Sequence, residues 1–431
     1  MPHNHTNFLF LLAILTLLLC TPPQTGALPL LASPGFRTLG FSDQDRGLRF
    51  DVNVWYPAKK APRPLKYPPW EFRGSLQAPP MSGRFPLIIV SHPSSGNRFS
   101  FYDTASELAS SGFVVACLTH DHDNMDSMPQ LYTWEEFAQR TRDISALIDY
   151  LLQDENIGPS IDPERIGILG IGAGAAAALY LGGALPDCSG WPAFCASEKN
   201  SVYCNSWAEK RISEKFCSAL PLTKSLADTR VKAVAAASPD FSMLLSRESL
   251  RYFYPPLLLV TAPRESDGSR KVPENLARLF PSAPKTVVIE KADNGTLMAP
   301  CPDSMIEELP EICRSVSGEE RAAIHEEFVR EVGSFFRHTL SEGEPAVIPQ
   351  PPDLTPKKPQ TVQAPPKGTE QTAPPETPEE AETALCPLPD SPALAGTHRS
   401  RKCNAKDKKC FSFPPPGKAK LFPEPADKKD A

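Results

Sequence analysis

Residues 166–179, IGILGIGAGAAAAL, constrain the fold of this chain more than any other stretch. An apolar run leads into a glycine-rich turn at residues 170–174, and an alanine-rich run follows. This order predicts a buried strand, a tight turn and a helix. Two chemistries use such a turn: a nucleophile held between strand and helix, or a phosphate bound by backbone amides.

Apolar runs on either side predict further strands. A hairpin is expected at residues 36–40 and 48–55, and later strands at 85–90, 113–118, 231–236, 256–261 and 286–290. Helices are expected at 102–111, 134–152 and 319–340, where apolar residues recur at helical spacing. A proline-rich loop is expected before residue 85, and a turn at residues 162–165. Strands alternating with helices predict a mostly parallel sheet with helices on both faces.

The first residues indicate export. Residues 8–19 form an apolar core that is short for a membrane span and typical of a signal peptide. We expect cleavage after Ala27, which leaves no membrane span and a secreted or periplasmic protein. No Lys or Arg precedes the core, so an uncleaved anchor is an alternative. Lipid attachment at Cys20 is another, although Leu19 stands where a small residue is needed.

Residues 28–341 are predicted to form one α/β domain, and residues 342–431 a disordered, proline-rich tail. The chain contains 49 prolines among 431 residues, and many fall in this tail. The net charge of −6 argues against a nucleic-acid partner, which needs a basic face.

Eleven cysteines fit an oxidising compartment. Four lie in a polar insertion, residues 187–227, which is expected to cap one edge of the domain: Cys188, Cys195, Cys204 and Cys217. Cys301 and Cys313 form a second group. The even count in each group predicts disulfides and leaves their pairing open. A metal site is the alternative, but the groups contain no histidine and no C-x-x-C. Cys117 is expected as a buried free thiol.

The glycine turn fits a dinucleotide fingerprint only in part. Gly170, Gly172 and Ala175 match G-x-G-x-x-A, but this fold also needs an acidic residue about 20 residues later. The cysteine-bearing insertion occupies that region. We therefore expect no cofactor, and interpret the turn as a nucleophile elbow.

Several blocks outside the turn support the elbow. They are RFPLIIVSHPSSGNRFSF, ASSGFVVACLTHDHDN, DPERIGILGIGAGAAAAL and PPLLLVTAPRESDG. In their order and spacing, residues 36–340 resemble secreted α/β-hydrolases of the dienelactone-hydrolase-like and platelet-activating-factor acetylhydrolase-like group. The resemblance implies an α/β-hydrolase fold with a serine elbow, an acid after the following strand pair and a histidine after the last strand.

The catalytic positions that the resemblance implies are degenerate. The nucleophile position falls on Gly172 and the histidine position on Asn294, so neither a nucleophile nor a base is present. The acid position falls near Asp267, with Glu265 as the other candidate. The backbone amides of Ser94 and Ala173 match the oxyanion donors of the group.

Relocated chemistry is the alternative. Ser94 or Ser95 could act as nucleophile with His92 or His120 as base. Residues 120–123, HDHD, include His122 and contain metal-ligand types. Strand alternation would place both histidines on one face, but we expect ordinary loop polarity and no metal.

Two further polar features need a structural test. His325 and His338 lie on the predicted closing helix and are expected at the surface. Asn294 also begins a glycosylation sequon, Asn-Gly-Thr.

Three functional hypotheses follow. The first is an exported, catalytically inactive hydrolase homologue that binds a small apolar or ester ligand in the old pocket, or acts as a scaffold. The second is a working ester or lipid hydrolase with relocated catalytic residues. The third is a structural envelope protein that contacts an envelope partner through its tail.

Overall fold

The computed structural model describes residues 32–43, 46–199, 201–220, 225–263, 276–307, 313 and 316–341. The expected signal peptide and proline-rich tail lie outside these residues. No helix within the described ranges is long and apolar enough to cross a membrane.

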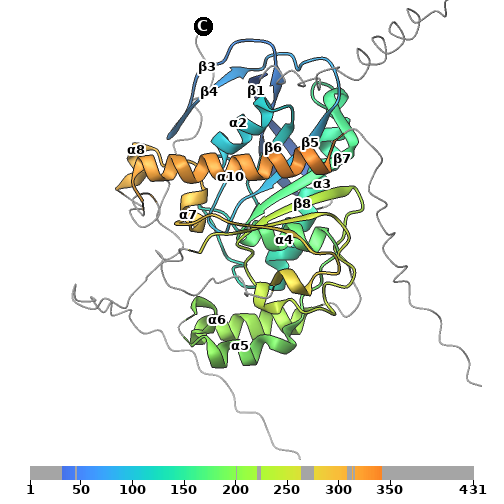
Figure 1. The fold of residues 1–431 in the computed structure, drawn as a ribbon, viewed down its shortest axis with the longest axis vertical. Coiled ribbons are helices and arrows are strands. Elements are labelled where there is room, and N and C mark those ends of the chain that lie inside the picture. The colour runs from blue at the N-terminus through green and yellow to red at the C-terminus, as the bar shows by residue number, and fades with distance from the viewer. Residues whose placement is uncertain are drawn as a thin grey trace, which may run out of the picture. The chain divides into compact units, whose positions relative to one another are not determined.

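The core of the domain is one ten-stranded sheet (Figure 1). Its strands are β1 (Ser33–Asp43), β2 (Leu48–Ala58), β3 (Arg63–Tyr67), β4 (Trp70–Leu76), β5 (Phe85–Ser91), β6 (Val114–Leu118), β7 (Ile161–Ile171), β8 (Val231–Ala237), β9 (Leu257–Thr261) and β10 (Lys285–Val288). They lie in the order β10-β9-β8-β7-β5-β6-β2-β1-β4-β3. Strands β5 to β10 run parallel, and β2 pairs antiparallel with β6. This is the α/β-hydrolase strand order, which confirms the expected fold.

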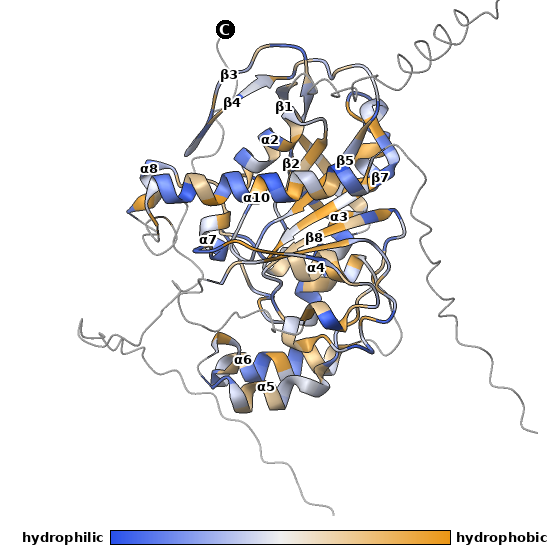
Figure 2. Cartoon of the chain, viewed as in Figure 1, coloured by the Kyte–Doolittle hydropathy of each residue, from blue (hydrophilic) through white to orange (hydrophobic). Residues whose placement is uncertain are grey.

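Helices cover both faces of the sheet. Helices α2 (Tyr102–Ser110) and α10 (Gly318–Thr339) pack on one face, and α3 (Trp134–Gln153) and α4 (Ala173–Leu181) on the other (Figure 1). Strand β5 is buried on both faces, because alternate residues join the two cores. Figure 2 accordingly shows apolar strands at the centre and a mixed polar and apolar α10 at the surface.

Capping side chains fix the two longest helices near their predicted starts. The Thr133 hydroxyl accepts from the Glu136 N–H at the start of α3, and the Ser317 hydroxyl accepts from the Glu320 N–H at the start of α10. Acidic residues in the first turn of each helix also stabilise it, because their negative charge interacts favourably with the positive end of the helix dipole.

Two local predictions were wrong. The expected proline-rich loop contains the hairpin β3–β4, whose strands pair from Arg63 with Gly74 to Tyr67 with Trp70. The expected turn at residues 162–165 lies inside β7. There the Asp162 carboxylate accepts from the Glu164 N–H and from Arg165, and the register with β5 shifts. A bulge therefore absorbs the turn residues without ending the strand.

The cysteine-rich insertion forms a helical cap, which we define as residues 187–227 without the undescribed residues 200 and 221–224. It contains α5 (Trp191–Ser197), α6 (Ser206–Arg211) and short helical turns (Figure 1). Disulfides join Cys188 to Cys217 and Cys195 to Cys204 within the cap, and Cys301 to Cys313 outside it. The predicted disulfides are therefore confirmed, and Cys117 is a buried free thiol.

Aromatic packing attaches the cap to the domain. Phe216 of the cap stacks on Phe241 at 5.1 Å between ring centroids and meets Phe137 of α3 edge-on at 5.6 Å. Tyr203 of the cap lies 5.2 Å from the Phe241 ring. The cap therefore packs against the domain, and its Tyr203 and Phe216 belong to the same buried core as Phe137 and Phe241.

Candidate functional site

The elbow is built from the close approach of β7, α4 and the end of β5. Gly172 connects β7 to α4 with φ 57° and ψ −119°, a conformation that residues with a side chain adopt only under strain. A Cβ on Gly174 would lie 2.0 Å from the Ser91 carbonyl oxygen, so only glycine permits this approach. The glycines therefore form a sharp, buried turn in which the Gly172 position faces Pro93, Asp240 and Asn294.

Asn294 faces this turn. It is the first residue of α7 (Asn294–Leu297), whose start is fixed by reciprocal hydrogen bonds between Asp293 and Thr296. A Cβ built on Gly172 would lie 3.6 Å from the Asn294 Nδ2 atom. The two residues that the resemblance placed at nucleophile and histidine positions therefore lie together, although they are 122 positions apart in the sequence.

The Asn294 side chain has no hydrogen-bond partner among the described residues. It is 6% exposed, and within that part of the chain neither Nδ2 nor Oδ1 is paired. A buried unsatisfied polar group costs about 1–3 kcal/mol, which makes such groups rare in native proteins. The same burial keeps Nδ2 out of solvent, so the Asn-Gly-Thr sequon is inaccessible to glycosylation in the folded domain.

The carboxylate near this turn is Asp240, which the sequence analysis missed. Asp267 and Glu265 lie outside the described residues. Asp240 follows β8, its N–H donates to the Gly172 carbonyl oxygen at 3.1 Å, and its Oδ2 would lie 3.3 Å from the Gly172 Cβ. The Tyr203 hydroxyl donates to Asp240 Oδ1 at 2.9 Å, so the cap contributes to the site. A polar Ser-Pro-Asp immediately after a buried strand was the available sequence indication.

The two predicted oxyanion amides belong to Ser94 and Ala173. Within the described part of the chain, neither N–H group donates to an acceptor. Ala173 begins α4, where the helix dipole adds a partial positive charge. The loop and helix start could therefore bind an oxygen acceptor.

His92 does not pair with either neighbouring serine. Its Nδ1 donates to the Pro93 carbonyl oxygen at 2.7 Å, and its Nε2 accepts from the His120 N–H at 3.1 Å. Burial and nearby Arg140 lower the pKa of His92 well below its usual value, which keeps the ring neutral. The Ser94 hydroxyl instead donates to Asp123 and Glu136, both at 3.3 Å.

Ser95 also lacks a base. It is exposed, and its φ of 64° places it in the left-handed region at the tip of the loop. The described residues therefore contain no pair between Ser94 or Ser95 and either His92 or His120.

A different hydrogen-bonded series of Ser, His and Asp side chains is buried at the end of β5. Ser91 Oγ lies 2.9 Å from His120 Nε2, and His120 Nδ1 lies 2.9 Å from Asp143 Oδ2. All three side chains are at most 1% exposed. Burial lowers the pKa of His120 and raises that of Asp143 to about 6, while Arg46 binds the other Asp143 oxygen at 2.5 Å. Ser91 ends β5 and Asp143 lies on α3, so no sequence spacing indicated this chain.

The HDHD residues lie in a loop, as expected, so the strand alternation considered for a metal site does not apply. Strand β6 ends at Leu118 and the chain then turns. His120 is buried, whereas His122 has φ 62° and an exposed ring that pairs with Asp121 at 3.0 Å. Among the described residues, no group of three or more His, Cys, Asp or Glu could hold a metal.

A buried charge cluster holds the oxyanion loop. Arg140 of α3 binds Asp123 Oδ2 at 2.5 and 2.8 Å and donates to the His92 carbonyl oxygen at 2.7 Å. Burial opposes the charge on Asp123, but Arg140 outweighs it and lowers the Asp123 pKa. Burial and Asp123 raise the pKa of Glu136, which favours its protonated form. The cluster therefore fixes the loop that carries the Ser94 amide.

Known proteins are similar to this chain at two levels. The sequence model of the family described as platelet-activating factor acetylhydrolase, isoform II, matches residues 71–156. No curated protein gives a significant match.

Solved structures are similar over most of the domain at low identity. Ferulic acid esterase from Streptomyces cinnamoneus is 15% identical with a TM-score of 0.49, over 74% of this chain and 93% of that one. Dienelactone hydrolase from Anabaena variabilis is 13% identical with a TM-score of 0.41, over 72% and 99%. The acylaminoacyl peptidase from Pyrococcus horikoshii is 15% identical with a TM-score of 0.41, over 73% and 43%.

The matched family segment begins in β4 and ends just after α3, so it includes the strand and loop that contact the elbow. The strand order of the sheet independently gives the fold. The chain is an α/β-hydrolase-fold protein that resembles the dienelactone-hydrolase-like and platelet-activating-factor acetylhydrolase-like group.

Proposed function

We propose that this protein is an exported, hydrolytically inactive α/β-hydrolase homologue that binds a ligand at the Gly172 elbow. The observation that carries the proposal is the 3.6 Å approach of the Gly172 Cβ position to Asn294 Nδ2. The two positions meet as a nucleophile and its base must, but they hold a glycine and an asparagine.

The chemistry of these residues supports inactivity. Glycine offers no nucleophile, and an asparagine amide does not take up a proton near neutral pH. In a hydrolase of this type, loss of the nucleophile or the base lowers kcat by about 10⁶-fold. Oxyanion donors and substrate binding alone leave a reaction rate about 10³- to 10⁴-fold above the rate in water.

The surviving donors suggest the ligand class. The Ser94 and Ala173 amides can donate to a carbonyl oxygen, and the buried Asn294 amide can do so once the segments that cover it open. Asp240 places a carboxylate beside the same spot, which disfavours an anionic ligand. An uncharged ester or a similar small apolar carbonyl compound therefore fits best. The disulfides are compatible with an extracellular or periplasmic location.

A paired measurement tests this function. The full chain is incubated with p-nitrophenyl butyrate, and nitrophenol release is compared with ligand-observed NMR of the non-reactive methyl butyrate. We expect NMR binding without release above buffer, and loss of binding in Asn294→Leu. Release that saturates with ester concentration would contradict inactivity, and absence of binding would contradict the ligand role.

The second candidate is a hydrolase with relocated catalytic residues, favoured by the Ser91–His120–Asp143 chain. In this series Ser91 would be the nucleophile, His120 the base and Asp143 the acid that orients the base. The Ser91 side chain has no exposure, however, and Arg140 Nη1 lies 3.4 Å from its hydroxyl. An ester cannot reach Ser91 unless the loop above it opens. In this candidate, Ser91→Ala abolishes ester hydrolysis.

A further inference from the structure

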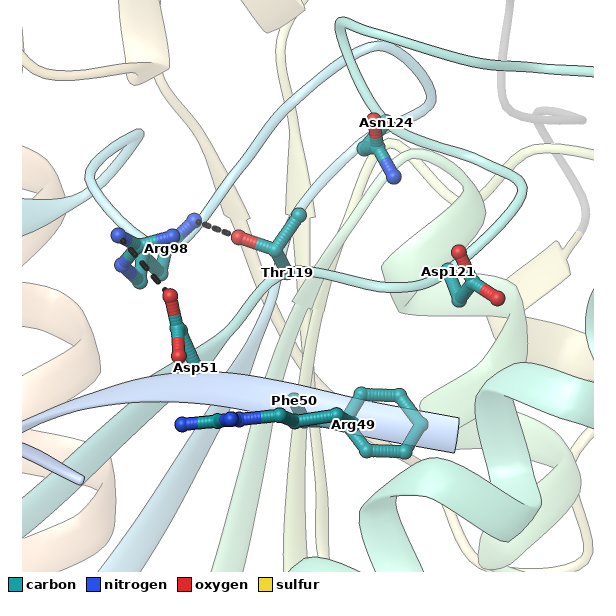
Figure 3. A pocket seen from close by; sticks show the side chains of 7 residues that line it. All are labelled: Arg49, Phe50, Asp51, Arg98, Thr119, Asp121 and Asn124. Carbon is teal, nitrogen blue, oxygen red and sulfur yellow. Dashed lines mark hydrogen bonds and ion pairs between the residues drawn. The ribbon is translucent and has the colours of Figure 1, made fainter. Parts of the chain in front are cut away.

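A polar pocket of about 400 Å³ lies between the start of β2 and the loops that follow β5 and β6 (Figure 3). Strand β2 runs antiparallel to β6, so its first residues lie beside the carboxyl end of β6. The pocket is lined by Arg49, Phe50, Asp51, Arg98, Thr119, Asp121 and Asn124. None of these residues belongs to the Gly172 elbow.

Arg98 is the unusual member of this lining. Its side chain is 28% exposed, and its buried Nε atom has no hydrogen-bond partner among the residues that the structure describes. Within the described part of the chain its guanidinium makes one long ion pair, 3.6 Å to Asp51, and lies 5.2 Å from the centre of the Phe99 ring. Burial lowers the pKa of Arg98 despite the nearby carboxylates. A guanidinium carries five donors, so this one is poorly compensated.

Other donors face the same space. Thr119 Oγ1 accepts a hydrogen bond from the backbone N–H of Arg98 at 3.1 Å, which leaves the Thr119 hydroxyl proton available to a ligand. Asn124 Nδ2 donates one proton to the His120 carbonyl oxygen at 2.7 Å, and its second proton remains. Figure 3 shows the Asn124 nitrogen pointing toward the space between Thr119 and Asp121.

Carboxylates set the charge of the ligand. Asp51 lies on the Arg98 side of the pocket, and Asp121 lies on the opposite side (Figure 3). Both are partly exposed, at 51% and 37%. The lining holds two guanidinium groups, of Arg49 and Arg98, and two carboxylates, so its formal charges balance and a ligand without net charge fits better than a doubly charged phosphate. A carboxylate on that ligand matches the planar fork of one arginine. The acid across the pocket, Asp121, contacts His122 through Oδ2 at 3.0 Å, which leaves Oδ1 to pair with a cation.

We propose that this pocket binds a small zwitterion, with its carboxylate on Arg98 and its ammonium group toward Asp121. Thr119 and Asn124 donate to the remaining lone pairs of the bound carboxylate. This site is separate from the ester-binding role of the elbow and does not depend on it.

Ligand-observed NMR and calorimetry on the full chain test the proposal, with 4-aminobutyrate, butyrate, butylamine and inorganic phosphate as probes. We expect 4-aminobutyrate to bind more tightly than the other three. Arg98→Gln should weaken its binding by about tenfold or more, and Arg98→Lys, which keeps the charge and most of the stem, should also weaken it because the fork is lost. Asp121→Asn should remove the preference over butyrate.

Arg330→Gln, an exposed change on α10, is the matched control and should bind as the wild type does. Circular dichroism checks that the Arg98 variants fold, since this side chain packs on Phe99. Absence of 4-aminobutyrate binding, tighter binding of phosphate, or binding unchanged in both folded Arg98 variants would overturn the proposal.

Discussion

Gly172 and Asn294 illustrate how a backbone can keep a catalytic geometry without catalytic side chains. The φ of 57° at Gly172 is costly for any residue except glycine, and proteins retain such strain where it positions a functional group. Here the positioned groups are the Ala173 N–H and the space that faces Asn294. The backbone geometry of the site is therefore present, whereas the side chains that would carry the chemistry are not.

Restoring the side chains should restore activity only in combination. Gly172→Ser alone is expected to stay inactive, because Asn294 cannot accept its proton. Gly172→Ser with Asn294→His should release nitrophenol from p-nitrophenyl butyrate above buffer. Its rate should stay low, since the new Cβ would lie 3.1 Å from Pro93 and 3.3 Å from Asp240. Activity in the single variant would mean that another base reaches Gly172.

Asn294 should also cost stability. Asn294→Leu removes the unpaired amide while keeping a similar volume, so the free energy of unfolding should rise by about 1–3 kcal/mol in urea titrations. Asn124→Leu is the matched control, because both polar atoms of Asn124 are hydrogen-bonded, and it should destabilise the domain. A loss of stability in Asn294→Leu would show that the amide is satisfied in solution.

At the scale of elements, the cap contributes directly to the elbow. Tyr203 lies in the short helical turn Val202–Cys204 of the cap, and its hydroxyl donates a hydrogen bond to Asp240 Oδ1. The Cys195–Cys204 disulfide links two residues nine positions apart, and Tyr203 lies between them, directly before Cys204. The covalent link therefore stabilises the segment from which this contact is made.

Removing that disulfide should loosen the cap before the sheet. A Cys195→Ser, Cys204→Ser double variant is expected to lower the free energy of opening of the cap by about 2–4 kcal/mol. Hydrogen exchange of residues 202–211 measures the change. The variant lacking Cys301 and Cys313 is the control and should leave these amides protected. Equal exchange in the wild type and the cap variant would refute the role of the disulfide.

Helix α10 carries a buried histidine that the sequence analysis placed at the surface. His325 is 7% exposed, and its Nδ1 lies 2.8 Å from Asp103 Oδ2 of α2, which forms an ion pair when the ring is protonated. The apolar spacing of α10 could not show this, because α2 packs beside the helix and supplies the counter-charge.

This pair should make stability depend on pH. Burial and Arg321 oppose the charge on His325, but Asp103 outweighs them and raises its pKa. A raised histidine pKa stabilises the fold below the unfolded value of about 6.5 and loses that contribution as pH rises through the folded pKa. The difference in unfolding free energy between wild type and His325→Gln should therefore shrink with rising pH. His338→Gln, exposed on the same helix, should show no such trend.

For the whole molecule, the sequence predicted the architecture better than the site. The buried runs at 85–90 and 113–118 became β5 and β6, because strands buried on both faces are apolar at every position. The hairpin β3–β4 escaped prediction because its prolines and charged residues resemble a loop, and pairing at the sheet edge decides its structure.

The site depends on contacts between distant segments. Gly172 and Asn294 could be named only through a resemblance, and their approach is a property of the folded sheet. Asp240 and the Ser91–His120–Asp143 chain involve pairs separated by many residues, so no local spacing indicated them. His92 and His120 looked like bases for Ser94 or Ser95, because the sequence does not show that the ring nitrogens of both already contact other groups.

Labelling of the purified full-length protein by a fluorophosphonate probe tests the central claim most directly, because the probe reacts only with activated serines. The Gly172→Ser, Asn294→His double variant serves as the positive control. We predict labelling of the double variant and none of the wild type. Stoichiometric labelling of the wild type that disappears in Ser91→Ala or Ser94→Ala would contradict the account.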